Sequence, residues 1–205
     1  MDVKIACKII FLMTIFLLSV IKSTSSSDND KLNIDVLYES RCPDSKNFMQ
    51  RHLKRVYPKI KDMVNLNYVP FGKAYSYSNN GGIRFHCQHG QRECDGNMFQ
   101  SCVLDVIGSD NQDLQTNFVV CAMDFSKNPQ NCAKNIGINL NKVDECMATN
   151  KGVQLQLKAE EDSTKIIRRS GFVPTIVYNG VYNGNDFWDS LDDFDAIVSN
   201  KLRSL

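Results

Sequence analysis

The stretch Tyr38–Ser45 (Tyr-Glu-Ser-Arg-Cys-Pro-Asp-Ser) places Cys42 between a predicted strand and a predicted helix. Apolar residues alternate along 32–38, which is typical of a strand. Along 48–57 they recur at steps of three and four, which is typical of one face of a helix. Pro43 suits the first helical position, so we expect the helix to begin directly after Cys42.

A thiol at a helix start lies beside unpaired backbone N–H groups and the positive end of the helix dipole. Both favour the thiolate, and such placement lowers a cysteine pKa from about 8.5 to about 3.5–7.5. We therefore expect Cys42 to be a disulfide-exchange nucleophile with a lowered pKa, although an inert buried thiol is the alternative. Redox sites of this kind carry Cys-x-x-Cys, whereas Ser45 occupies the fourth position here.

The first 25 or so residues differ in character from the rest of the chain. Two lysines precede the apolar run Ile9–Ile21, and a serine-rich segment follows it, as in a secretory signal peptide. The run is shorter than the about 20 residues that a membrane span needs, and an uncleaved anchor is the alternative. We expect a signal peptide at 1–25, a single domain at 26–205, and no membrane span after cleavage.

Cysteine spacing is the next constraint. Of the eight cysteines, Cys7 lies in the predicted signal peptide and Cys42 stands alone. Because cysteines of exported proteins oxidise in pairs, we expect three disulfides among the remaining six, Cys87, Cys94, Cys102, Cys121, Cys132 and Cys146. Their connectivity stays open. A metal site of Cys87, His89, Cys94 and Cys102 is the less favoured alternative, so no metal and no other cofactor is expected.

Charge limits the classes of partner. The formal net charge is +1 and no basic patch is interleaved with aromatic residues, so we expect no nucleic-acid partner. The signal peptide predicts a secreted or extracellular protein. The chain has no Asn-x-Ser/Thr sequon, which weighs against glycan-dependent sorting to lysosomes. For His86 and His89 we expect structural hydrogen bonds rather than acid–base chemistry.

The first strand and helix extend into a βαβ unit. Pro58 is expected to end the helix, and residues 64–71 alternate as a second, parallel strand. Residues 73–150 carry the six paired cysteines, helical patterns at 113–125 and 141–148, and no clear strand. This region is therefore predicted to be a mostly helical insertion stapled by disulfides.

The C-terminal part completes the order of elements. A helix is expected over 153–169, ended by Gly171. Two β-rich segments within 175–182 flank Asn179-Gly180, a strong signal for a tight hairpin. A last helix is expected over 187–202. The predicted order is β-α-β, insertion, α, β-β-α.

This order resembles the thioredoxin fold, in which Cys-Pro-x-x follows the first strand and Val-Pro-Thr, here residues 173–175, precedes a late hairpin. The resemblance implies that Pro174 has a cis peptide bond and packs beside the sulfur of Cys42, although only about 5–6% of X–Pro bonds are cis. The fold class expected is α/β, a thioredoxin-like fold with a disulfide-rich, mostly helical insertion.

The insertion carries a narrower match. The segment Cys87–Cys102 reproduces in full the signature Cys-Gln-His-Gly-x2-Glu-Cys-x2-Asn-x4-Cys of the gamma-interferon-inducible lysosomal thiol reductase (GILT) family. Residues 38–40 and 69–74 are also similar to that family. The resemblance covers nearly the whole chain after the leader and implies an exported thiol reductase that opens protein disulfides. It assigns the attacking cysteine to Cys42 and the cis-proline to Pro174.

Ser45 lies where the family has its resolving cysteine. In the dithiol mechanism a second thiol resolves a mixed disulfide, which a hydroxyl cannot do, although serine can stabilise the Cys42 thiolate. We therefore expect a secreted GILT-like protein with impaired or absent dithiol reductase activity that acts by binding other proteins. The alternative is monothiol exchange or isomerisation, or thiol reductase activity, through Cys42 on a disulfide-containing protein substrate. The odd thiol also offers a route to a disulfide-linked dimer.

Overall fold

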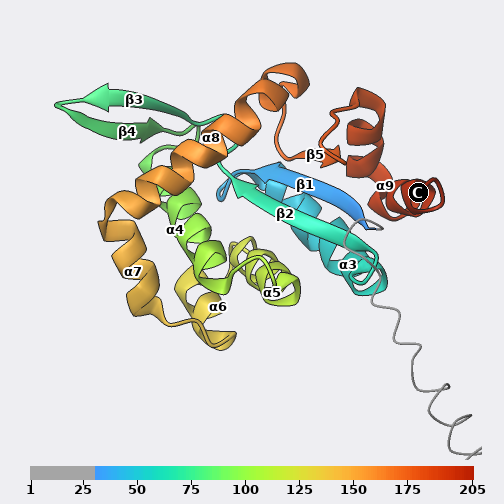
Figure 1. The fold of residues 1–205 in the computed structure, drawn as a ribbon, viewed down its shortest axis with the longest axis horizontal. Helices are drawn as coiled ribbons and strands as arrows, with labels where there is room; N and C mark the ends of the chain where they lie inside the picture. The colour runs from blue at the N-terminus through green and yellow to red at the C-terminus, as the bar shows by residue number, and fades with distance from the viewer. Residues whose placement is uncertain (1–30) are drawn as a thin grey trace, which may run out of the picture. The chain divides into compact units, whose positions relative to one another are not determined.

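The computed structural model describes residues 31–205, whose elements are labelled in Figure 1. The predicted signal peptide at 1–25 lies outside the described residues. Among the helices of residues 31–205, none has the length and apolar character that a membrane crossing requires.

A three-stranded sheet with the order β2-β1-β5 is the centre of the fold. It consists of β1 (Leu32–Tyr38), β2 (Val64–Pro70) and β5 (Thr175–Tyr178). β1 runs parallel to β2 and antiparallel to β5, with Val36 opposite Tyr68 on one side and Ile176 on the other. The central strand therefore delivers the chain to Cys42 at the carboxyl end of a parallel pair.

One continuous helical segment follows β1. It comprises α2 (Pro43–Phe48), the π-helical turn η2 (Met49–Leu53) and α3 (Lys54–Ile60). Cys42 is its N-cap and Pro43 occupies the first turn, so the helix begins where the sequence predicted. Phe48, Met49 and Leu53 are buried on the face that the spacing predicted to be apolar.

The predicted end of this segment at Pro58 is wrong, because α3 continues to Ile60. Proline lacks the N–H that would bond to the carbonyl four residues back. Here that loss falls in the last turn, shortly after η2, where the hydrogen-bonding pattern already departs from that of an α-helix. Burial of Val56, Tyr57 and Ile60 keeps the last turn helical.

The insertion after β2 contains both strands and helices. Its elements are β3 (Tyr75–Asn79), β4 (Gly82–His86), α4 (Gln91–Ile107), α5 (Gln112–Ala122), α6 (Pro129–Asn135) and α7 (Leu140–Ala148). α5 and α7 match the predicted helices to within a few residues. α8 (Asn150–Ser170) then returns the chain to the sheet, and Gly171, in the left-handed region at φ +65°, ends it as predicted.

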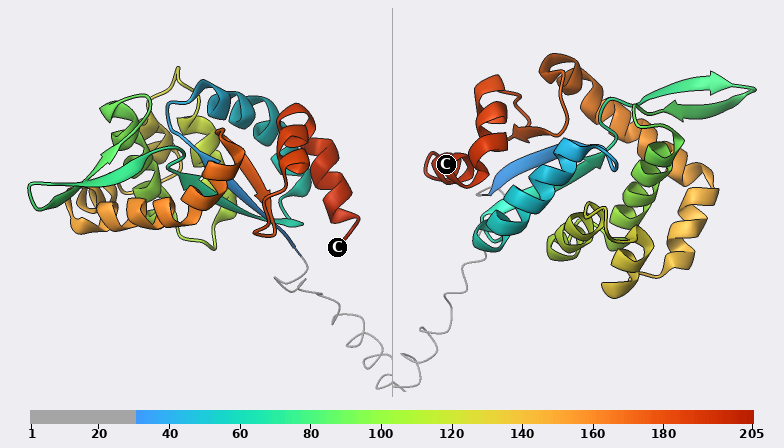
Figure 2. Two further views of the ribbon diagram at one scale, coloured as in Figure 1. Left: turned by 90° about the horizontal axis from the view of Figure 1, so that it is seen from above. Right: turned by 180° about the vertical axis from the view of Figure 1, so that it is seen from behind.

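The expectation of no strand within 73–150 is wrong, because β3 and β4 form an antiparallel hairpin. The sequence does carry a short alternation there, with Tyr75 and Tyr77 spaced by serine and Ile83 and Phe85 spaced by arginine, although most of the hairpin's side chains are exposed. Asn80 and Gly81, both at positive φ, form the turn. The hairpin extends away from the helices in Figures 1 and 2, and Ser76 N–H donates to Glu160 of α8 at 2.9 Å.

The second strand of the predicted C-terminal hairpin is also absent from the described chain. Asn179 and Gly180 do turn at positive φ, and Val181 forms a single bridge to Tyr178. The chain then leaves the sheet because Asn183 caps α9 (Gly184–Leu202), accepting hydrogen bonds from two backbone N–H groups of its first turn.

Helices cover both faces of the sheet. The α2–α3 segment and α8 lie on opposite faces, as the left view of Figure 2 shows. α9 packs against η2 and β5, and α8 packs against β2, β5 and α4. The sheet is thus enclosed on both sides, with the junction between β1 and α2 at its edge.

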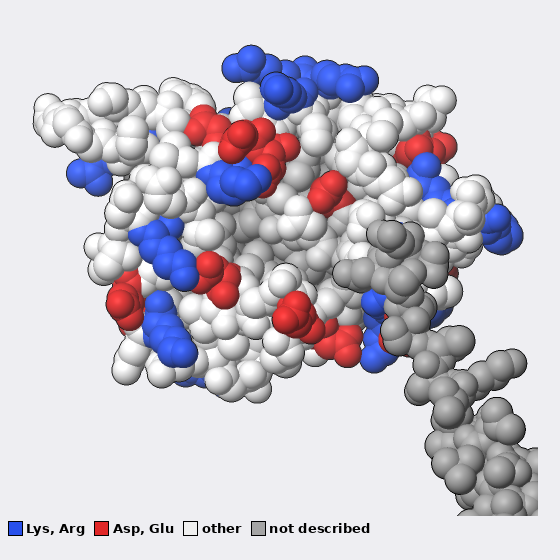
Figure 3. Space-filling model, viewed as in Figure 1, with Lys and Arg blue, Asp and Glu red and all other residues white. Residues whose placement is uncertain are grey.

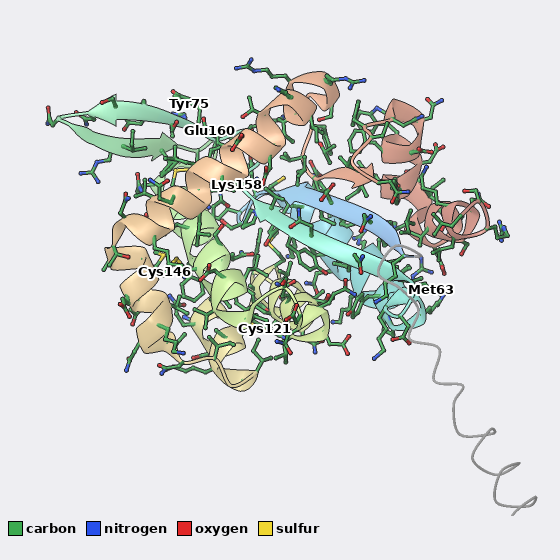
Figure 4. All side chains as sticks on the ribbon, in the orientation of Figure 1. Met63, Tyr75, Cys121, Cys146, Lys158 and Glu160 are labelled. Atoms are coloured by element: carbon green, nitrogen blue, oxygen red, sulfur yellow. A yellow bond between two sulfur atoms is a disulfide. The ribbon has the colours of Figure 1, made fainter. Side chains whose placement is uncertain are left out.

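Three disulfides fasten the insertion. Cys102–Cys146 joins α4 to α7, Cys121–Cys132 joins α5 to α6, and Cys87–Cys94 joins the loop after β4 to α4. Figure 4 labels Cys121 and Cys146 in this helical part of the molecule. These pairs use the six cysteines of residues 87–146, so the alternative metal site of Cys87, His89, Cys94 and Cys102 has no free thiolate to supply.

Candidate active site around Cys42

The backbone at Cys42 turns from strand to helix within a few residues. Its φ and ψ of −71° and 124° are extended, its N–H donates to Glu39 O at 3.3 Å, and its carbonyl accepts from Lys46 N at 3.0 Å. Among residues 31–205, Cys42 is the cysteine outside a disulfide. Its side chain is 3% exposed, so the sulfur is buried at the start of the helix.

The predicted lowering of the Cys42 pKa is wrong in direction. Burial raises the pKa of the thiol, because the charged thiolate loses its hydration. Backbone N–H groups of Ser45 and Asp44 and the Ser45 hydroxyl act in the opposite direction, as the helix-start geometry predicts, but they do not outweigh burial. The nearby Glu39 carboxylate raises the pKa further through charge repulsion.

Ser45 lies in the first turn of α2 and is fully buried. Its Oγ accepts a hydrogen bond from Glu39 N at 3.4 Å. The side chain therefore links the helix start back to the residue that follows β1. It supplies a hydroxyl at the position where a second thiol would resolve a mixed disulfide.

Pro174 lies close to the sulfur, in the loop before β5. The Val173–Pro174 peptide bond is cis, and the Cys42 thiol donates to Val173 O at 3.7 Å. Cys42 also belongs to a small apolar cluster that includes Leu37, Val173 and Val177. The structure thus brings Pro174 together with Cys42 and Ser45, although it lies about 130 residues further along the chain.

Residues of the signature segment form hydrogen bonds to the end of β1 and to Ser40, just before Cys42. Tyr38 Oη donates to Gln100 Oε1 at 2.7 Å, and Ser40 N donates to Asn97 Oδ1 at 2.8 Å. Ser40 Oγ donates to the Glu93 carbonyl at 3.1 Å. α4 therefore fixes the segment that runs from the end of β1 to Cys42.

Glu39 is the most constrained residue of that segment. Its side chain is fully buried and accepts from Lys73 N at 2.7 Å and from Gln88 Nε2 at 2.6 Å. Gly72, at φ +62°, packs so closely that a Cβ there would lie 2.3 Å from the Glu39 Cγ. Glycine at position 72 leaves room for the carboxylate between β2 and the insertion.

A second buried carboxylate and a histidine complete this group. His89 Nδ1 lies 2.5 Å from Glu93 Oε2 and 3.4 Å from Glu39 Oε2, and His89 N donates to Glu93 Oε1 at 3.2 Å. In residues 31–205, these three side chains are the set of ligand-type groups close enough together to hold a metal ion. Each carboxylate oxygen already accepts from an N–H group or faces the imidazole, so a cation would have to displace those donors.

The pKa of Glu39 is raised to about 7, because burial and, to a smaller extent, the Glu93 carboxylate outweigh the hydrogen bonds from Lys73 N–H and Gln88 and the charge of His89. The sequence had assigned no function to Glu39, Gln88 or Glu93. The sequence did contain a hint of their role. Glu39 directly follows an apolar strand, and Gln88 and Glu93 are fixed positions of the signature, so hydrogen-bonded side chains could have been expected at all three. His89 has the predicted structural hydrogen bond, whereas His86 stacks on Tyr75 at 4.9 Å between ring centroids.

Comparison with known proteins identifies the family and the fold separately. The family model described as "Gamma interferon inducible lysosomal thiol reductase (GILT)" matches residues 33–136. GILT-like protein 1 of Drosophila melanogaster is 32% identical over 168 residues, which cover 73% of this chain and 66% of the relative. A gamma-interferon-inducible lysosomal thiol reductase-like protein of Anopheles gambiae is 30% identical over 185 residues, 83% of this chain and 76% of the relative.

Among solved structures, the oxidoreductase DsbA from Xylella fastidiosa is similar with a TM-score of 0.53 and 18% identity. The match covers 86% of this chain and 88% of that chain. At 18% identity, the similarity shows a shared fold and nothing more. It confirms the predicted α/β, thioredoxin-like fold with a largely helical insertion.

Proposed function

The chain belongs to the gamma-interferon-inducible lysosomal thiol reductase family, and on that premise we propose that it is a secreted protein that binds other proteins and lacks complete dithiol reductase turnover. The observation that carries this proposal is the buried Ser45 hydroxyl in the turn above Cys42. A mixed disulfide formed at Cys42 has no thiol within α2 to resolve it.

The environment of Cys42 supports the same proposal. Disulfide exchange requires a thiolate, and burial together with the Glu39 carboxylate raises the pKa of this thiol. A disulfide-linked dimer through Cys42 would also require this 3% exposed side chain to reach a second chain. Burial therefore favours a monomeric binding protein over a covalent dimer.

A surface suited to protein binding lies on the β3–β4 hairpin. Tyr75 and Tyr77 lie on one face of the hairpin and are 52% and 44% exposed. The projecting hairpin carries almost no charge in Figure 3, whereas the rest of that face mixes both signs. Tyr75 is labelled in Figure 4, close to Glu160 of α8. Such exposed aromatic residues are typical of protein interfaces, and the mixed charge of this face does not favour nucleic acid.

Monothiol exchange is the second candidate function. Two observations favour it: the Cys42 thiol faces Val173 O beside Pro174, and backbone N–H groups of α2 stabilise its thiolate. In this reaction the thiolate attacks one sulfur of a substrate disulfide, forms a mixed disulfide with Cys42, and releases the other sulfur as a thiolate. A small external thiol must then release Cys42.

Reduction of a protein disulfide by the purified chain tests the proposal. We expect wild-type reduction near background, and Ser45→Cys to raise it severalfold because the added thiol resolves the mixed disulfide. Ser45→Ala is the matched control and should remain near background. Wild-type turnover equal to that of Ser45→Cys would contradict the proposal.

Cys42→Ala separates the two candidates. If the chain acts by binding, Cys42→Ala leaves its biological activity intact. If it acts by monothiol exchange, the variant loses that activity. Sequencing of the N-terminus of the exported protein tests cleavage near residue 25 and the secreted location.

A further inference from the structure

A small cavity opens beside the segment that leads into Cys42. Its volume is about 210 Å³, and it lies between residues 40–41, the first half of α4 and the connection from α5 to α6. The Cys121–Cys132 disulfide fastens that connection. Three parts of the chain that are distant in sequence therefore enclose one cavity, which the proposed function does not yet use.

The inner wall of this cavity is polar, but its hydrogen bonds are already made. Ser40 and Gln100 are buried there. Ser40 Oγ donates to a backbone carbonyl of α4 at 3.1 Å, while Gln100 accepts from Tyr38 and donates to Met123 Sδ. Gly96 packs so closely that a Cβ there would lie 2.5 Å from Ser40 Oγ. The inner wall is thus rigid, and the attraction for a ligand must come from the outer wall.

The outer wall is positively charged. Arg41, Arg92 and Lys127 line it, and all three residues are exposed. Among the ion pairs of residues 31–205, Lys127 faces Asp124 at 3.8 Å, whereas neither guanidinium is paired with a carboxylate. The described residues that line the cavity include no aspartate and no glutamate. Two unpaired guanidinium groups therefore favour an anionic ligand.

An exposed aromatic ring borders the same cavity. Phe125 is 44% exposed, and Lys46 Nζ lies over its ring at 5.1 Å, which adds a fourth cation nearby. Aromatic residues and arginine together are typical of protein interfaces, where the ring supplies apolar contact and the guanidinium supplies directed hydrogen bonds. This combination suits an acidic side chain that has an apolar neighbour.

We propose that the cavity binds the carboxylate of an acidic side chain in a segment of a partner protein, with an apolar neighbour of that side chain packed on Phe125. Arginine suits a carboxylate because its planar guanidinium offers two parallel N–H groups. At about 210 Å³ the cavity is smaller than the about 300–1,000 Å³ of small-molecule sites, so it holds one side chain rather than a whole ligand. The inference rests on the proposed function, since it names the chemistry of the protein segment that is bound.

Fluorescence anisotropy of labelled peptides, measured with the full exported chain and its disulfides intact, tests this inference. The probe is the peptide Gly-Gly-Phe-Glu-Gly-Gly with blocked ends, and the matched peptide has Gln in place of Glu. We expect the Glu peptide to bind more tightly by roughly tenfold or more, as the loss of a charge-assisted hydrogen bond predicts. Equal binding of the two peptides would overturn the inference.

Substitutions in the chain locate the binding site. Arg41→Gln and Arg92→Gln should each weaken binding of the Glu peptide about tenfold, as the loss of one charged hydrogen-bond donor predicts. Arg168→Gln is the matched control, because it removes the same charge from an exposed position on α8. It should leave binding unchanged, and an effect as large as that of Arg92→Gln would overturn the inference by showing that net charge alone attracts the peptide.

Phe125→Ala tests the apolar part of the site. It should weaken binding of the Glu peptide severalfold and leave unchanged a peptide that has Gly in place of Phe. Free glutarate presents the same carboxylate without the segment, so it should not displace the Glu peptide at equal concentration. Displacement by glutarate would overturn the protein segment as the occupant.

Failure of this inference is distinguishable from failure of the proposed function. Absence of peptide binding together with wild-type disulfide reduction near background would overturn the anion-binding cavity alone. Peptide binding as expected, together with wild-type reduction equal to that of Ser45→Cys, would contradict the proposed function and leave the cavity as a site for acidic segments.

Discussion

Two regions of the molecule meet at Cys42, and they differ in how they follow the family pattern. The junction between β1 and α2 departs from it at Ser45, whereas the segment Cys87–Cys102 matches the signature at every fixed position. The first region supplies the thiol, and the second supplies hydrogen bonds to residues 38–40. The signature therefore serves to hold the segment before Cys42, and that task does not depend on a resolving thiol.

The largest expected effect comes from the disulfide that joins the end of the signature to α7. Loop-closure entropy predicts that replacing Cys102 and Cys146 by Ala lowers the free energy of unfolding by about 4 kcal/mol. The same change at Cys87 and Cys94 should cost about 2 kcal/mol, because the loop it closes is far shorter. The sequence separations are 44 and 7. Urea denaturation of the two double variants measures the difference.

A larger loss of stability in the Cys87/Cys94 variant than in the Cys102/Cys146 variant would show that the short signature loop, rather than the Cys102–Cys146 disulfide, holds the insertion together. In either case we expect the second double variant to disturb Glu39 more, because Gln88 and His89 lie within its loop. The pH dependence of its unfolding is the accompanying readout, because Glu39 titrates near pH 7.

The pH dependence of stability should follow Glu39. Its pKa in the folded chain is about 7, above the about 4.3 of an exposed glutamate, so the folded state binds the additional proton between these values. The stabilisation from this proton is complete below about pH 4.3 and is lost as the pH rises through about 7. The loss amounts to roughly 3 kcal/mol for this group.

Glu39→Gln should remove that contribution, because glutamine does not titrate. Denaturation of wild type and variant at a series of pH values gives the difference between their stability curves, in which the other titrating groups cancel. If the stability curves of wild type and Glu39→Gln run parallel across the pH range, protonation of Glu39 is not coupled to folding.

Gly72→Ala tests how tightly the core region encloses the Glu39 carboxylate. The new Cβ would lie 2.3 Å from Glu39 Cγ in a residue at φ +62°, so we expect a loss of about 1–3 kcal/mol from strain and displacement of the carboxylate. Gly171→Ala is the matched control, because Gly171 has φ +65° and open space around it. Equal losses in the two variants, measured by thermal unfolding, would mean that backbone strain alone is responsible.

Tyr38→Phe should cost no more than Gly72→Ala. It removes the hydrogen bond to Gln100 at 2.7 Å and leaves a buried acceptor unpaired, which costs about 1–3 kcal/mol at most. Gln100 also donates to Met123 Sδ, which limits its rearrangement. Urea denaturation is the measurement. A loss no larger than that of Tyr77→Phe, on the exposed hairpin, would show that this contact of the signature does not hold β1.

Local patterns in the sequence were sufficient for the elements that bury an apolar face. The strand at 32–38, the helix start after Cys42 and the stop at Gly171 depend on residues within a turn or two of one another. The hairpin at 75–86 alternates apolar and polar residues over only a few positions and leaves most of its side chains exposed, so pairing across the turn and the contact of Ser76 with Glu160 were needed to establish it.

The sequence by itself determined the family, the fold class and the absence of a second thiol at Ser45, because each depends on residue identity and spacing. Tertiary structure alone decided the disulfide partners, the direction of the Cys42 pKa shift and the meeting of Glu39, His89 and Glu93. The physical reason is that desolvation and charge coupling depend on what packs around a group. The helix start at Cys42 predicted the stabilising N–H groups, but the burial that outweighs them comes from residues far along the chain.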